Sequence, residues 1–407
     1  MLTLVPLAST LNPPEQVAAT VARVSGRLSR HGIEHQFVPA PAPAEAGTAL
    51  FIATGGTEHL AMSALDGQIG PVVLVAHPEQ NSFPAALEIL SRLRQLGRPG
   101  RIVLLNDADD GLDELARLAA YDAVRRGLAS LRLGRIGTPS DWLVGSMPDA
   151  ETVARVWGPR VIDVPMSDVV NRLSGVSETE AEAVRADFVG GAAAVTEPTA
   201  SDLDAAARVV VALRDTVREH RLDACAVRCF DLVVDCRTTG CLALSWLIDH
   251  GVVAGCEGDV PATVTMAWAK AISGQAGFIA NPQDVDRRTN CVWLAHCTIA
   301  RGMVSRYTLR SHFESSLGVG IEGRIDPGPA TLVRIGGADL RDLFVSDADV
   351  VATGDRALRC RTQVEVRLAS DAGVLLTRPA GNHHVLIQGH WAARLREYFD
   401  WWVAPKA

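Results

Sequence analysis

Short apolar runs alternate with amphipathic helical stretches through about the first 140 residues of the chain. Stretches with the apolar spacing of surface helices, such as Glu15–His31 and Ala85–Leu96, separate these runs. This alternation is typical of a parallel sheet covered by helices, and uniformly apolar strands indicate burial on both faces. Four runs are predicted as buried strands: Leu2–Leu7, Ala49–Ala53, Val72–Ala76 and Arg101–Leu105.

A second series of the same kind follows the first. Trp142–Val144 and Arg160–Val164 are predicted as strands, Ser201–His220 as a long helix and Ala224–Cys229 as a further strand. We therefore predict a second α/β domain after the first.

Beyond Arg301 the pattern changes to short strands separated by Gly, Pro and Asp turns. Ala330–Ile335, Arg361–Val366 and Val374–Leu376 are predicted as strands, and Trp391–Trp402 as a closing amphipathic helix. Many short strands with turn residues between them indicate a β-rich domain, and we predict a small barrel.

The predicted fold class is α/β, with two Rossmann-like, doubly wound domains followed by a β-rich, barrel-like C-terminal domain. The predicted boundaries are residues 1–165, 166–300 and 301–407. A chain of 407 residues is too long for a single hydrophobic core, which agrees with several domains.

Charge and hydropathy exclude several classes of protein. A net charge of -8 argues against nucleic acid or an anionic membrane as a partner. The chain has no apolar run of about 18 residues, and its first residues lack the basic segment of a signal peptide, so we expect a cytoplasmic protein without a membrane span. Its eight cysteines include no Cys-x-x-Cys pair, so we expect reduced thiols and no zinc ribbon.

Two loops follow predicted strands of the first domain, where α/β proteins bind ligands. Thr54–Glu58 and His77–Ser82 match neither a dinucleotide-binding fingerprint nor a phosphate-binding loop. Ser82 is a candidate substrate-binding residue; the alternative is that these loops are tight turns and Ser82 is a helix cap.

Glu257 is the strongest candidate for chemistry. It lies in a loop between Gly255 and Gly258, which allow the backbone to turn tightly. Asp259 is a good N-cap residue and Pro261 suits a first helical turn, so a helix is predicted from here to about Ser273. A carboxylate held at this position can bind a hard cation or remove a proton.

Further polar residues follow predicted strands. Asn281 ends an apolar strand and could bind a metal or sugar hydroxyls, and Asp284 could be a ligand or a turn residue. His296 also ends a strand, as either a catalytic or a structural histidine. Since successive strand residues point to opposite faces, only one of His383 and His384 is expected to face a given metal, and the other could bind substrate.

Six segments follow one another along the chain: Arg228–Cys229, Cys256–Asp259, His296–Thr298, Ser311–Ser315, Gly318–Ile321 and Gly381–Val385. In this order they resemble the L-fucose isomerase/L-arabinose isomerase superfamily, and in particular its shorter fucose-isomerase-like proteins. The resemblance implies aldose–ketose isomerisation through a cis-enediol, assisted by a divalent metal, usually Mn²⁺, with Co²⁺ or Mg²⁺ as alternatives. It also implies a homo-oligomer (trimer, tetramer or hexamer) with active sites at subunit interfaces.

The resemblance also implies roles for individual residues. Glu257 matches a metal-binding acid/base carboxylate, His384 matches a C-terminal histidine ligand, and His296 resembles a histidine of the arabinose branch. Asn281 stands where fucose isomerases place a second acidic ligand, and an amide cannot transfer protons. The predicted metal ligands are Glu257, Asn281 and His384, and the predicted catalytic residues are Glu257 and His296; Asp284, Glu314 or His296 would replace the missing acid.

The predicted substrate is a monosaccharide. A deoxy sugar is one special case. Arg228, Arg306 and Arg310 lie near the candidate residues in sequence, and arginines suit an anionic substituent, so an anionic C6-substituted sugar such as a sulfosugar is another. The candidate substrate-binding residues are Arg228, His383, Ser82 and Glu314.

Three other functions remain open. A metal-dependent lyase or epimerase would also pass through an enediolate, and product analysis would separate it from an isomerase. A non-catalytic sugar-binding protein would need no metal. A structural oligomer with a decayed metal site is suggested by Asn281 alone.

Overall fold

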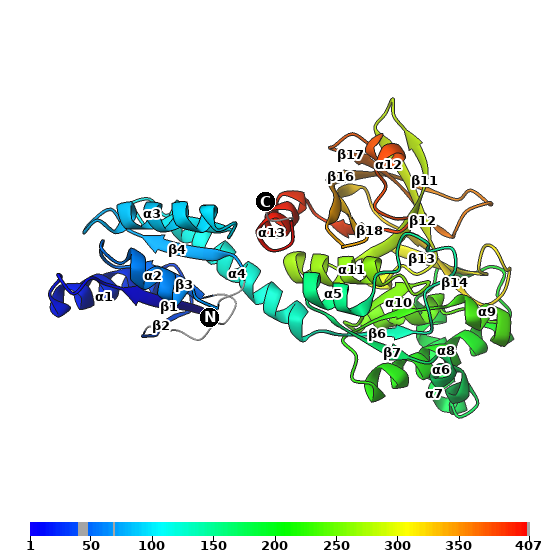
Figure 1. Ribbon diagram of the computed structural model, residues 1–407. Helices are drawn as coiled ribbons and strands as arrows, with labels where there is room; N and C mark the ends of the chain where they lie inside the picture. The colour runs from blue at the N-terminus through cyan, green and yellow to red at the C-terminus, as the bar shows by residue number, and fades with distance from the viewer. Residues whose placement is uncertain (40–47, 68–69, 405–407) are drawn as a thin grey trace. The chain divides into compact units, whose positions relative to one another are not determined.

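A computed structural model describes residues 1–39, 48–67 and 70–404 (Figure 1). The chain divides into two compact units, one of Met1–Arg126 with Tyr398–Ala407 and one of Gly127–Glu397. The predicted division at residues 165 and 300 differs from this one and stays a prediction. Within the described ranges, no helix is both long and apolar enough to cross a membrane.

The first unit contains the predicted parallel sheet, with strand order β2-β1-β3-β4-β5. Every residue of β4 is buried, as expected for a strand covered on both faces. Near the C-terminus, Tyr398 packs edge-to-face on Tyr121, with ring centroids 5.7 Å apart. The elements are β1 (Leu2–Leu7), α1 (Pro14–Arg30), β2 (His35–Phe37), β3 (Thr48–Ile52), α2 (Glu58–Ala64), β4 (Val72–Ala76), α3 (Ser82–Gln95), β5 (Gly100–Leu104) and α4 (Asp110–Ser130).

The second unit begins with a four-stranded parallel sheet of order β10-β9-β6-β7. Its strands are β6 (Arg132–Ile136), β7 (Arg160–Val164), β9 (Ala224–Val227) and β10 (Val253–Cys256). Its helices are α5 (Ala150–Trp157), α6 (Met166–Leu173), α7 (Glu178–Gly191), α8 (Ala200–Glu219), α9 (Phe230–Cys236), α10 (Cys241–Asp249) and α11 (Val260–Ser273). The second set of parallel strands is thus present.

The predicted barrel is also present, as a closed barrel of order β11-β12-β17-β16-β15-β18. Its first two strands precede Arg301, where the sequence pattern changes. The barrel strands are β11 (Phe278–Asp286), β12 (Cys291–His296), β15 (Gly328–Gly336), β16 (Asp342–Gly354), β17 (Thr362–Leu368) and β18 (His384–Gln388). A small three-stranded sheet is formed by β8 (Ala194–Val195), β13 (Arg306–Arg310) and β14 (Gly320–Arg324). The remaining elements are η1 (Arg301–Met303), α12 (Val374–Thr377) and α13 (Ala392–Trp402).

Two predicted strands are wrong. Trp142–Val144 forms successive turns, in which Leu143 N–H donates to Ser140 O and Ser146 N–H donates to Leu143 O. Val374–Leu376 lies in the short helix α12. Both runs are only three residues long, too short for apolar spacing to distinguish a strand from a turn or a helix.

Helix α11 lies between the barrel and the parallel sheet of the second unit (Figure 1). It contacts β9 and β10 of the parallel sheet as well as β11, β15 and β18 of the barrel. Its first ten residues, Val260–Ala269, are all buried, and a helix enclosed on all sides is expected to be apolar all round. The loop before α11 is therefore held between the parallel sheet and the barrel.

Gly255 allows β10 to approach α11 closely. A Cβ at this position would lie 2.0 Å from Oγ1 of Thr263 and 3.2 Å from its Cβ. Gly255→Ala is expected to lower the free energy of unfolding of the second unit by about 1–3 kcal/mol, because Thr263 must move within a packed core. Urea unfolding measures this loss.

Gly127→Ala is the matched control, since within the described part of the chain no atom lies within 4 Å of a Cβ built in α4 at that position. This control should be neutral or slightly stabilising, by at most about 1 kcal/mol. Equal stability of the two variants would contradict the packing argument.

Candidate metal centre

Glu257 lies in the tight turn that joins β10 to α11, at the carboxyl end of a parallel strand. Its φ of 59° is in the left-handed region, which is unfavourable for a residue with a side chain. Its carbonyl accepts from Ser140 N–H at 2.9 Å, and Gly258 N–H donates to Val227 O at 2.9 Å. At Gly258 a Cβ would lie 2.8 Å from Cα of Pro139. The neighbouring backbone therefore holds Glu257 in a strained conformation, as is common at functional sites.

Three buried side chains meet beside this turn: Glu257, His296 at the end of β12, and His383 just before β18. One ligand atom from each lies within 4.8 Å of the other two. Nε2 of His383 is 3.5 Å from Oε1 of Glu257, and the two imidazole centroids are 5.4 Å apart. This group could hold a metal ion.

A second carboxylate lies behind His383. Nδ1 of His383 is 3.0 Å from Oδ2 of Asp259, and Arg334 Nη1 lies 3.1 Å from each carboxylate oxygen of Asp259. The side chains of Asp259, Arg334 and His383 are all 0% exposed. Asp259 also accepts from Ala262 N–H at 2.8 Å, so the predicted N-cap of α11 is confirmed.

The electrostatics of the group follow from burial and from these contacts. Burial raises the pKa of Glu257, but the nearby His383 outweighs this effect and holds that pKa below its ordinary value. Burial likewise raises the pKa of Asp259, whereas Arg334 lowers it, to about 2 overall. Burial lowers the pKa of His296 to about 4. Burial also lowers the pKa of His383, but the hydrogen bond to Asp259 and the nearby Glu257 carboxylate raise it to about 9. At neutral pH the metal-free group thus has two carboxylates and one imidazolium.

Trp142 completes the surroundings of Glu257. Its indole Nε1–H donates to Oε2 of Glu257 at 2.5 Å, which leaves Oε1 on the side of His383. The Trp142 ring packs edge-to-face on Phe230, with centroids 4.9 Å apart. The sequence did not predict this contact between Trp142 and Glu257, because Trp142 lies in a run that was predicted as a strand.

The donor set suits a divalent transition metal, since carboxylate and imidazole are common ligands of such ions. Within the described part of the chain, Nε2 of His383 is buried and has no hydrogen-bond partner. A buried polar atom without a partner is costly, and a bound metal ion would satisfy it. The residues therefore fit the cofactor that the resemblance implies, although the geometry identifies no particular metal.

Two predicted metal ligands line a cavity that Glu257, His296 and His383 do not line. Asn281 and His384 line a cavity of about 480 Å³, together with Asp284. His384 packs edge-to-face on Phe344, and burial lowers its pKa to about 3. Neither Asn281 Oδ1 nor His384 Nε2 has a hydrogen-bond partner among the residues that the structure describes. The predicted roles of these two residues in metal binding remain predictions.

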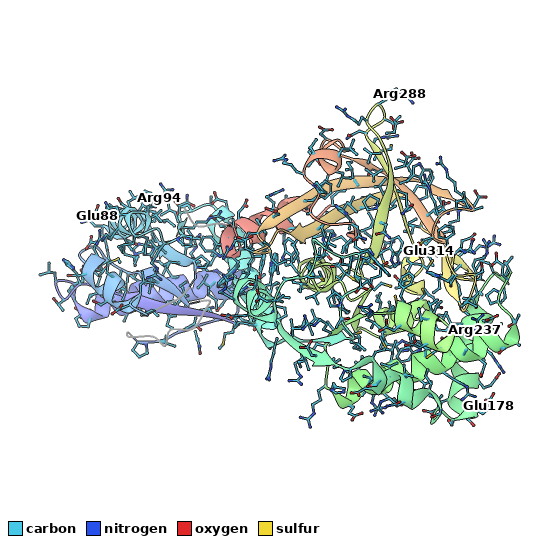
Figure 2. The ribbon with its side chains drawn as sticks, turned by 45° about the vertical axis from the view of Figure 1, so that its right-hand side comes forward. Glu88, Arg94, Glu178, Arg237, Arg288 and Glu314 are labelled. Carbon is cyan, nitrogen blue, oxygen red and sulfur yellow. The ribbon has the colours of Figure 1, made fainter. Side chains whose placement is uncertain are left out.

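The remaining candidates have other contacts. Arg228 donates from Nε to Asp231 at 2.8 Å and from Nη1 to the loop at residues 138–141, so its guanidinium holds that loop. Ser82, in the first unit, is fully buried; it donates to Ile52 O and accepts from His77 N–H. Glu314 is exposed (Figure 2). Substrate binding by these residues stays a prediction.

Comparison with known proteins gives a partial similarity. No protein-family model matches the chain. A sulfoquinovose isomerase of Alkalicoccus urumqiensis is 24% identical over 225 residues, which cover 53% of this chain and 49% of that protein. Sulfoquinovose isomerases of Priestia aryabhattai and Priestia megaterium are each 25% identical over 172 residues, covering 39% of this chain and 37% of theirs. The similarity thus spans about half or less of these relatives, and at low identity it agrees with the resemblance to the superfamily.

Proposed function

We propose that the protein is a divalent-metal-dependent aldose–ketose isomerase of monosaccharides. This proposal rests on the buried group of Glu257, His296 and His383. In this group, Nε2 of His383 faces the Glu257 carboxylate but makes no hydrogen bond to it. The similarity to three sulfoquinovose isomerases favours a sugar with a sulfonate at C6 as the substrate class.

In the proposed reaction, Glu257 removes the proton from C2 of the open-chain aldose. The electron pair of that C–H bond forms the C1–C2 double bond of a cis-enediol while the π pair of the C1 carbonyl moves to O1, which takes up a proton. Glu257 then returns the C2 proton to C1 as O2 loses its proton and becomes the ketose carbonyl oxygen. A bound divalent cation would supply Lewis-acid polarisation of the sugar oxygens. Glu257 suits the role of base because its pKa lies below the ordinary value, so it is ionised at neutral pH.

His296 is the proposed second acid/base group. Its Nδ1 lies 3.1 Å from the hydroxyl of Thr298, and its lowered pKa keeps the imidazole neutral. A neutral imidazole can both donate and accept a proton, which the exchange of hydroxyl protons between O1 and O2 requires. This assignment would account for an amide, Asn281, where fucose isomerases have an acid.

Proton NMR in D₂O tests the proposed reaction. The protein with Mn²⁺ is incubated with sulfoquinovose, unsubstituted aldohexoses and aldopentoses, and 6-deoxy sugars, each with and without EDTA. Loss of the C2 proton together with appearance of a ketose, both abolished by EDTA, is the expected result. Metal binding without exchange on any of these sugars would contradict the isomerase proposal, and a cleaved or C2-inverted product would identify a lyase or an epimerase instead.

Trp142→Phe tests the hydrogen bond that orients Glu257. The substitution keeps an aromatic ring against Phe230 but removes the indole donor from a buried carboxylate. A hydrogen bond to a charged group contributes about 1.5–3 kcal/mol, so kcat/KM for the aldose that exchanges is expected to fall by about 10-fold or more.

Trp246→Phe is the matched control, since Trp246 stacks on His250 in α10 and does not contact Glu257. Steady-state rates of ketose formation measure both variants. If the two substitutions have equal effects, the Trp142 hydrogen bond does not contribute to the reaction.

A further inference from the structure

The two ring nitrogens of His383 have different surroundings. Nδ1 is 3.0 Å from a carboxylate oxygen of Asp259, at hydrogen-bonding distance. Nε2 is 3.5 Å from Oε1 of Glu257, too far for a good hydrogen bond, and it has no such partner within the described ranges of the chain. One nitrogen is therefore held by the protein and the other faces the Glu257–His296 group.

The Asp259 carboxylate has two partners besides His383. Its Oδ1 accepts from Ala262 N–H at the start of α11, and both of its oxygens lie 3.1 Å from Arg334 Nη1. Arg334 is held in turn by the hydroxyl of Ser146 at 2.8 Å and by Ala380 O at 3.3 Å. Asp259 is thus held by the backbone of α11 and by a buried arginine that is itself hydrogen-bonded.

We propose that Asp259 and Arg334 are a positioning pair, which keeps a proton on Nδ1 of His383 and directs the Nε2 lone pair to the metal ion. An ionised carboxylate can only accept, so the nitrogen that faces Asp259 must carry hydrogen. Nε2 can then ligate the metal ion once binding displaces the proton that this nitrogen carries in the metal-free imidazolium. Such carboxylate partners of metal-bound histidines fix both the tautomer and the ring orientation. This inference rests on the proposed metal site but not on the identity of the sugar.

A capping role alone does not account for the arrangement. The cap of α11 uses only Oδ1, whereas Oδ2 faces His383. A buried arginine is also unnecessary for capping, because most helix caps are single polar side chains without a counter-ion. The Arg334 guanidinium stabilises the charge of the buried Asp259 carboxylate, which a capping residue does not need but a partner of a metal-bound histidine does.

Asp259→Asn separates capping from positioning. Asparagine caps helices as well as aspartate, so Oδ1 can still accept from Ala262 N–H. The amide nitrogen would then replace Oδ2 and donate to Nδ1 of His383, which moves the histidine proton to Nε2. The affinity for Mn²⁺, measured by calorimetric titration, is expected to fall by about 10- to 100-fold.

The matched control is Asp149→Asn. Asp149 caps α5 by accepting from Thr152 N–H at 2.6 Å, so the same substitution is made at a helix cap that contacts no histidine. This variant should bind Mn²⁺ with wild-type affinity. Circular dichroism and urea unfolding establish that both variants are folded.

Long-range ¹H–¹⁵N NMR of histidine-labelled protein reads the tautomer directly. In the wild-type protein loaded with diamagnetic Zn²⁺, the proton of His383 is expected on Nδ1, with the signal assigned by its absence in His383→Gln. In Asp259→Asn without metal, the proton is expected on Nε2. A wild-type His383 with its proton on Nε2 would overturn the proposal even if Asp259→Asn does not fold.

The outcomes distinguish this proposal from the proposed function. If the wild-type protein binds neither Mn²⁺ nor Zn²⁺, the metal-dependent function fails and the positioning role fails with it. If the wild-type protein binds metal and folded Asp259→Asn binds it equally well, only the positioning role is overturned.

Discussion

Glu257→Gln is expected to reduce kcat for the proposed isomerisation by about 10²–10⁴-fold, the usual contribution of a positioned acid/base group. Glutamine has the same shape and can still accept from Trp142 Nε1–H through its amide oxygen. It cannot take a proton from C2, so exchange of that proton with D₂O should be lost together with ketose formation.

The measurement compares ketose formation and C2 proton exchange in this variant with those in Glu88→Gln. Glu88 is an exposed glutamate of α3 (Figure 2), and its replacement should leave both rates unchanged. Calorimetric titration with Mn²⁺ shows how much of the loss comes from weaker metal binding. Retention of more than about a tenth of kcat with saturating metal would rule out Glu257 as the base.

Regular parts of the fold were predictable because their patterns are local. β1, β4 and β7 have the predicted bounds, since each is a short run rich in apolar residues that ends before a helical stretch. The barrel was predicted from turn residues and short strands, but its first strand begins at Phe278, before the change in pattern. The strands of a barrel pair over long sequence separations, as β11 does with β18, and a local pattern carries no information about such partners.

The candidate site was predictable only in part. Glu257 could be found because flanking glycines and a following helix cap indicate a tight turn at a strand end. The sequence could not decide between His383 and His384, which lie on opposite sides of one strand end; the structure places His383 beside Glu257 and His384 at a separate cavity. Arg334 gave no signal, because one arginine in a strand pattern looks the same whether it faces solvent or a buried carboxylate.

Arg334→Met is expected to have the largest effect on stability. Arg334 and Asp259 form an ion pair with both side chains fully buried, and methionine replaces most of the volume but leaves the carboxylate without its cation. Removing one partner of a buried ion pair typically costs about 3–5 kcal/mol, because the remaining charge stays in a region of low polarity. The same substitution at Arg288, which is exposed (Figure 2) and whose Nη2 lies 3.7 Å from Oδ2 of Asp286, should cost at most about 1 kcal/mol.

Native-state hydrogen exchange followed by mass spectrometry suits this measurement, because it gives the opening free energy of individual peptides in a chain with two compact units. Peptides from β15 and α11 should lose protection in Arg334→Met, whereas peptides from the first unit should not. The double variant Arg334→Met/Asp259→Asn should be more stable than the sum of the two single effects, because it removes the stranded charge. Additive losses would mean that the two side chains contribute to stability independently, and the ion pair would then not be what stabilises this part of the core.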